Sequence, residues 1–174
     1  MNGQLLEKCI WFGMAAVGFA ILFNVPKRSL PAIFVIAALG GTTKLVLMQF
    51  DISIIVATLA GATLIGFLSI PLAHRIHVPP PIFSIPAVIP MVPGILAYRM
   101  MLGLVKLAGS IDPATYNSVL SETINTGLKV MLILMSLAGG VGIPMLITRK
   151  ESAKNLHFIR RRNENESSGN ADFS

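Results

Sequence analysis

Apolar residues in this chain form long runs separated by short segments that contain proline or polar residues. Five runs, at residues 5–23, 31–50, 52–73, 82–107 and 123–147, match the length of about 20 residues that a helix needs to cross a membrane. A water-soluble fold has no means of covering so much continuous apolar surface. The pattern predicts an all-α integral membrane protein of about five transmembrane helices, with a transmembrane domain over residues 1–150.

The segment after residue 150 has a different composition. Residues 151–174 contain the basic cluster Arg160, Arg161 and Arg162, followed by Asn, Glu, Ser and Gly. Segments with so few apolar residues do not bury enough surface to offset the entropy of ordering. We predict that residues 151–174 are a polar, disordered tail.

Composition supports the membrane assignment. Hydrophobic residues make up 53% of the 174 and charged residues only 13%, whereas charged residues are about a quarter of a typical soluble domain. The net charge of +6 raises the question of nucleic-acid binding. However, most basic residues flank or interrupt the apolar runs or lie in the tail, as membrane insertion requires, so we predict no nucleic-acid partner.

The placement of basic residues also predicts an orientation. With five spans, the loops after the first and third runs lie on the same side as the C-terminus. That side carries nine Lys and Arg residues, and the opposite loops carry only Lys8. Basic residues concentrate in cytoplasmic loops. We therefore predict that the N-terminus lies outside and the C-terminus lies in the cytoplasm.

The fourth run contains a group of prolines, among them Pro86, Pro90 and Pro93, followed by Gly94. Each interior proline lacks an N–H donor and leaves a carbonyl four residues earlier without its helical partner. One hypothesis is a helix broken near the middle of the membrane, in which Gly94, Ile95 and Leu96 offer free N–H groups to an anionic substrate. The alternative is a kinked helix with a purely structural role, and the sequence favours neither.

Besides Lys8 near the start of the first run, four basic residues lie inside the apolar runs. Arg99, Gly103 and Lys106 share one face of a helix at positions i, i+4 and i+7, and Tyr98 adjoins Arg99. Lys44, Lys106 and Lys129 lie within about 10 Å of the outer ends of their runs. They form either an outer cationic vestibule for a carboxylate or, as their positions favour, side chains that extend to water. Arg99 lies deeper, which favours a functional role in the substrate pathway.

Other chemistry has little support in the sequence. Cys9 is the only cysteine, and His74 and His77 have no acidic or thiol companion, so we predict no metal site and no cofactor. We find no nucleophile–base pair, zinc motif or phosphate-binding loop, and therefore predict that the chain is not an enzyme. No Asp or Glu lies at the centre of a span, which disfavours proton coupling through a buried carboxylate.

Two segments resemble a known family. The sequences GFAILFNVP at residues 18–26 and AVIPMVPG at residues 87–94, with Tyr98 following, resemble the YjjB-like small subunits of the threonine/serine exporter family. The resemblance covers about residues 11–149. The resemblance assigns no role to Arg99, and the tail beyond Lys150 lies outside it.

The resemblance implies a multi-pass protein of a bacterial or archaeal plasma (inner) membrane. It also implies export of small carboxylates or hydroxy amino acids, such as succinate, threonine or serine, together with a larger, YjjP-like membrane subunit. The small size of the chain independently favours a hetero-oligomer or homo-oligomer surrounded by membrane lipid. The alternative is a scaffold that stabilises such a complex without taking part in transport.

Overall fold

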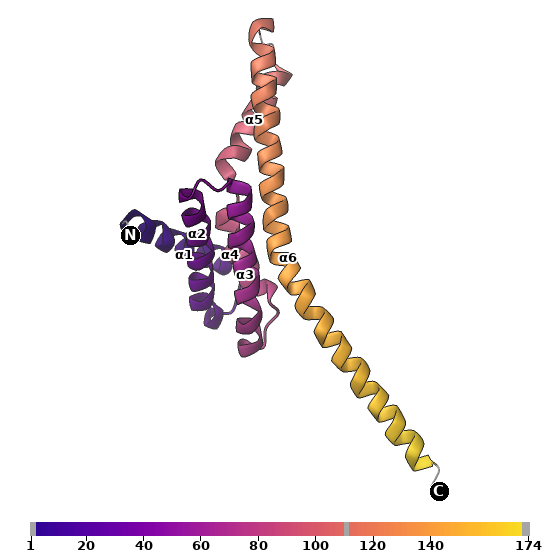
Figure 1. Ribbon diagram of the computed structural model, residues 1–174. Helices are drawn as coiled ribbons and strands as arrows, with labels where there is room; N and C mark the ends of the chain where they lie inside the picture. Colours follow the sequence, from indigo (N-terminus) through magenta and orange to yellow (C-terminus); the bar gives the residue numbers. More distant parts are fainter. Residues whose placement is uncertain (1–2, 110–111, 172–174) are drawn as a thin grey trace.

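The computed structural model describes residues 3–109 and 112–171. All the regular elements within these ranges are helical (Figure 1). They are α1 (Gly3–Leu22), the short 3-10 helix η1 (Lys27–Ser29), α2 (Leu30–Gln49), α3 (Ile54–Ile76), α4 (Pro81–Val88), the 3-10 helix η2 (Ile89–Met91), α5 (Gly94–Ala108) and α6 (Pro113–Ala171).

The predicted membrane architecture is confirmed. Four segments of the described chain are long and apolar enough to cross a membrane, namely 5–22, 27–49, 54–76 and 113–148. A fifth span is formed if α4 with η2 and α5 are counted together, and this pair is bent by 59°. The bend lies in the proline-rich run, for which the sequence left open a broken helix or a kinked one.

Three residues with left-handed backbone conformation end the first three long helices. Asn24, Asp51 and His77 have φ values of 55°, 57° and 57°, and Asn, Asp and His are the side chains that tolerate this conformation best. In each case the next residue donates a backbone hydrogen bond to the carbonyl five positions earlier, which closes the helix end. These bonds join Val25 to Ala20 (3.0 Å), Ile52 to Leu47 (3.3 Å) and Val78 to Ala73 (3.1 Å).

The helices approach one another through small residues. A Cβ atom added to Gly61 of α3 would lie 2.6 Å from the carbonyl oxygen of Gly40 in α2. On the other side of α3, a Cβ atom on Gly140 of α6 would lie 2.7 Å from the Cβ of Ala62. Such contacts allow van der Waals packing where lipid provides no hydrophobic driving force between helices. The largest fully buried side chains around them are Phe83, Ile33, Ile36, Ile65 and Met91.

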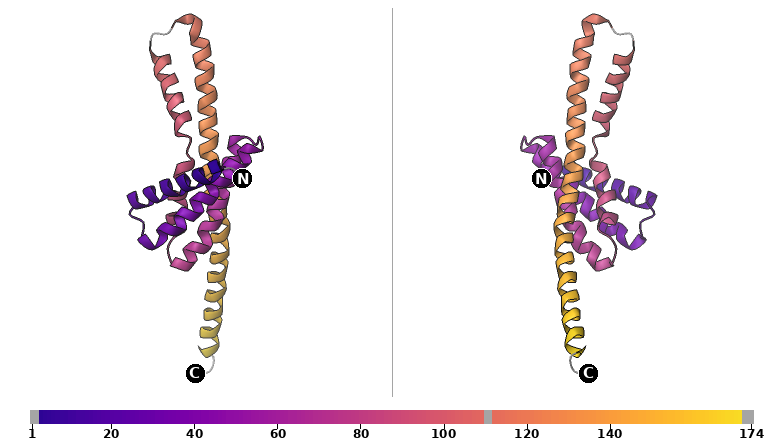
Figure 2. Two further views of the ribbon diagram at one scale, coloured as in Figure 1. Left: turned by 90° about the vertical axis from the view of Figure 1, so that its left-hand side faces the viewer. Right: turned by 90° about the vertical axis from the view of Figure 1, so that its right-hand side faces the viewer.

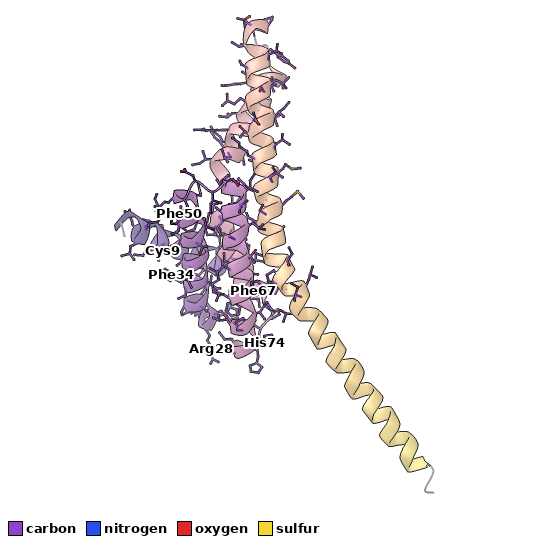
Figure 3. The ribbon with its side chains drawn as sticks, in the orientation of Figure 1. Cys9, Arg28, Phe34, Phe50, Phe67 and His74 are labelled. Atoms are coloured by element: carbon purple, nitrogen blue, oxygen red, sulfur yellow. The ribbon has the colours of Figure 1, made fainter. Side chains whose placement is uncertain are left out.

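Helix α5 and the first part of α6 form a hairpin that extends beyond the end of the α1–α4 bundle (Figures 1 and 2). Figure 3 places Phe50 at the end of the bundle that faces this hairpin, and Arg28 and His74 at the opposite end. No residue of α5 is buried. Residues 108–122 lie between the fourth and fifth apolar runs, yet α6 already begins at Pro113, where proline suits the first helical position.

The C-terminal part of α6 leaves the bundle and extends alone to Ala171 (Figure 1). This part includes most of the segment from residue 151 that we predicted to be a polar tail. No proline after Pro144 interrupts the helix, yet in the views of Figures 1 and 2 no other described helix lies beside this part. A polar helix without tertiary contacts is only marginally stable in water. The lack of helices packed against this part agrees with the prediction of a polar tail outside the membrane bundle.

Candidate functional site

The helix break lies between Met91 and Gly94, where the backbone unwinds for two residues. Val92 is extended (φ −62°, ψ 133°), and Pro93 precedes the first residue of α5. The local hydrogen bonds differ from those expected. The Ile89 carbonyl, which Pro93 was expected to leave free, accepts from Val92 N–H at 3.0 Å, and Gly94 N–H donates to the Val92 carbonyl at 2.9 Å. The Ile89 carbonyl and the Gly94 N–H group are therefore both hydrogen-bonded within tight turns of the break.

The Met91 carbonyl at the break has a partner far away in the chain. The Lys44 ammonium group donates a hydrogen bond of 3.0 Å to this oxygen. Lys44 is only 8% exposed and Met91 is 1% exposed, so the contact is buried. Lys44 therefore does not extend to water as its position favoured. Among the described side chains, it is a buried cation whose hydrogen-bond acceptor is neutral.

This contact also fixes the depth of the break. Lys44 lies six residues before Phe50, which corresponds to about 9 Å along the helix axis. The Met91 carbonyl oxygen lies beside the Lys44 ammonium group, and the Met91 side chain reaches the contact between Gly40 and Gly61. The break therefore lies between the middle of α2 and the end of the bundle at Phe50. The midplane position of the break stays a prediction.

A second unusual group lies at the same level. The hydroxyl of Thr58 in α3 is fully buried and has no hydrogen-bond partner among the described residues. Thr58 precedes Ile65 by seven residues and so shares the face of α3 that meets Gly40. Since α2 and α3 are antiparallel with Gly40 opposite Gly61, Thr58 lies one turn further along, near the level of Lys44. Buried hydroxyls without partners are uncommon and require an explanation.

The cationic face of α5 meets α6 around a cavity of about 200 Å³. Arg99, Gly103 and Lys106, which the i, i+4, i+7 spacing grouped, all line it. The residues from α6 are Val119, Glu122, Thr123 and Thr126. The spacing on α5 was visible in the sequence, whereas the opposing residues of α6 were not.

The remaining predicted site residues lie apart from these two places. Tyr98 is 62% exposed, and Lys129 is exposed on α6. The structure does not bring Lys44, Lys106 and Lys129 together as one vestibule. From Gly94 to Lys106 the helix rises by about 18 Å, and α5 runs away from the bundle that contains Lys44 (Figure 2). Pro86 is buried in the core, and Pro90 is half-buried at the break.

His74 and His77 line a larger cavity of about 550 Å³ at the opposite end of the bundle. It lies between the end of α3, the proline-rich turn and α6, where Met145 and Thr148 contribute. His74 is bonded through Nδ1 to the carbonyl oxygen of Ile70 at 2.8 Å, and His77 closes α3. No group of three or more His, Cys, Asp or Glu side chains suited to a metal ion occurs within the described part of the chain.

Comparison with known proteins identifies a family for this chain. A family model described as "Threonine/Serine exporter, ThrE" matches residues 8–147. An uncharacterized protein of Haemophilus influenzae is 34% identical over 145 residues, which is 83% of this chain and 48% of the relative. The chain thus spans about half the length of that relative. No solved structure matches the chain.

Proposed function

Because this chain belongs to the threonine/serine exporter family, we propose that it is the small membrane subunit of a secondary exporter of small carboxylates or hydroxy amino acids. The substrates that fit this proposal are succinate, threonine and serine. The family is one of multi-pass membrane transporters, in agreement with the apolar helices. The proposed pathway passes the break at Pro90, Pro93 and Gly94.

The observation that carries the proposal is the buried contact between Lys44 and the broken helix. A charge inside a membrane bundle is costly, and such residues mark substrate or ion pathways. Lys44 is paired only with the neutral Met91 carbonyl among the described groups. A passing carboxylate would supply the missing counter-charge and would replace a weaker hydrogen bond by a charge-assisted one. This arrangement favours an anionic group on the substrate.

The length of the relative supports the proposal of a partner. Since the match covers 48% of the Haemophilus influenzae protein, about half of that chain has no counterpart here. We propose that a larger, YjjP-like membrane subunit supplies it. Partner and chain would together enclose the α5–α6 hairpin, of which α5 has no buried residue in the single chain.

Export from cells tests this proposal. Cells that carry this chain, the candidate partner, both or neither are loaded with labelled threonine, serine or succinate, and the initial rate of efflux is measured. We expect efflux only when both chains are present, and Lys44→Met should lower it at least tenfold at unchanged membrane levels.

The same experiment addresses the scaffold alternative. Unchanged efflux from cells with the partner alone would contradict a transport role for this chain. Efflux that falls in parallel with the membrane level of the partner would indicate a stabilising scaffold instead. Loss of efflux in Lys44→Met with a normal level of the assembled complex separates transport from assembly.

A further inference from the structure

The cavity between α5 and α6 combines charges of both signs, and it is distinct from the helix break. We propose that it binds an α-amino acid as a zwitterion, with the carboxylate at Arg99 and Lys106 and the ammonium group at Glu122. This inference rests on the proposed function, because it names the class of substrate that the exporter would hold there.

The floor of the cavity is a close contact between the two helices. A Cβ atom on Gly103 would overlap the hydroxyl of Thr123, so only glycine allows α6 to approach this closely. Thr123 is 6% exposed, and its hydroxyl donates to the Val119 carbonyl at 2.7 Å. The threonine is therefore held in place, and the geometry around it is defined by packing.

The charged groups lie on either side of this contact. Arg99 is one turn before Gly103 and Lys106 is one turn after it, so the two bases are about 10 Å apart along α5. Because α5 and α6 run antiparallel (Figure 2), Thr126 lies near the level of Arg99, and Glu122 lies near Gly103. All of these residues line the same cavity of about 200 Å³, a volume comparable to roughly six water molecules.

The charges are complementary to a zwitterion. Among the described residues, Glu122 forms no ion pair with Arg99 or Lys106, so each group is available to a ligand. A zwitterion offers one carboxylate and one ammonium group, and the hydroxyl of Thr126 lies beside them for a hydroxylated side chain. In a dicarboxylate the second carboxylate would meet Glu122, and like charges in one cavity repel. Threonine and succinate have the same number of non-hydrogen atoms, so charge and not size would distinguish them.

Binding to the whole chain, purified from membranes with its co-purifying partner and placed in lipid nanodiscs, tests this site. Labelled L-threonine and labelled succinate serve as the probes. Glu122→Gln should weaken threonine binding roughly tenfold or more, the loss expected for a hydrogen bond to a charged group. Succinate binding should stay the same or become stronger. Glu122→Asp should retain the preference for threonine.

Glu7→Gln is the matched control, because it removes the same charge from an exposed position on α1. Equal losses in Glu7→Gln and Glu122→Gln, or an unchanged threonine-to-succinate ratio in Glu122→Gln, would overturn the proposed site. If one of these results is found but the wild-type complex still exports its substrate, the proposed function stands without this site. If it binds threonine through Glu122 but exports none, the site stands and the exporter proposal fails.

Discussion

The Lys44 ammonium group donates a hydrogen bond to the carbonyl oxygen of Met91, which lies 47 positions later in the chain, at a distance of 3.0 Å. The contact joins α2 to the last residue of η2, immediately before the backbone unwinds. It replaces a helical bond that the extended Val92 and the following Pro93 prevent. The break is therefore stabilised from outside its own helix.

Replacing Lys44 by methionine should impair both transport and the geometry of the break. Methionine preserves much of the apolar volume but leaves the buried Met91 carbonyl without its donor, which costs about 1–3 kcal/mol. We expect efflux of labelled substrate to fall at least tenfold and thermal unfolding in detergent to occur at a lower temperature.

The matched control for that substitution is Lys129→Met. Lys129 is exposed on α6, and the same loss of charge there should leave efflux and unfolding nearly unchanged. If both variants transport like the wild type, the buried ammonium group has no role in the pathway.

Replacing Gly94 by leucine should separate function from packing. A Cβ atom built at this position meets no atom of another part of the described chain within 4 Å, so a side chain begins there in open space. A leucine side chain at the first position of α5 would instead shield the N–H groups of Ile95 and Leu96 from a ligand. We expect efflux to fall while membrane levels remain normal.

Gly61→Leu provides the contrast, because a Cβ atom there would lie 2.6 Å from the Gly40 carbonyl oxygen. That variant should lose folded protein, measured as monodisperse material after detergent extraction. Normal efflux in Gly94→Leu together with normal efflux in Pro90→Ala would show that the break is an ordinary kink.

The buried hydroxyl of Thr58 predicts an unusual stability effect. Thr58→Val removes a polar atom that has no partner among the described residues and keeps the side-chain shape. Because an unsatisfied buried group costs about 1–3 kcal/mol, the unfolding temperature in detergent should stay the same or rise. A large decrease would show that the hydroxyl is satisfied in the membrane, for example by water.

A comparison with Ser69→Ala calibrates the Thr58 result. The Ser69 hydroxyl donates to the Ile65 carbonyl at 2.7 Å and is equally buried. Its removal should destabilise the protein slightly, by about 0.5–1.5 kcal/mol. Opposite signs for the two substitutions are the expected pattern.

The orientation of the chain remains a prediction that fusion proteins can test. A reporter active only in the cytoplasm should be active when fused after Ile147 and silent when fused after Gly109, in the turn between α5 and α6. The expectation rests on the nine basic residues of the predicted cytoplasmic side against one on the other. Activity at both positions would mean that α6 does not cross the membrane.

The sequence by itself determined the membrane character, the number of apolar spans and the position of the helix break. These are local properties: hydropathy depends on each residue, and a proline removes its own N–H wherever it stands. The common face of Arg99, Gly103 and Lys106 also follows from helical spacing alone. The segment AVIPMVPG at residues 87–94, which resembles the exporter family, contains Pro90 and Pro93 and therefore coincides with the break.

Only the tertiary structure decided which distant groups meet. The pairing of Lys44 with Met91 depends on how α2 and α3 pack through Gly40 and Gly61, a contact between residues far apart in the chain. Glu122 likewise joins the cationic face of α5 only because Gly103 lets α6 approach. Close packing between helices is set by the shapes of both partners, and a single run of sequence contains only one of them.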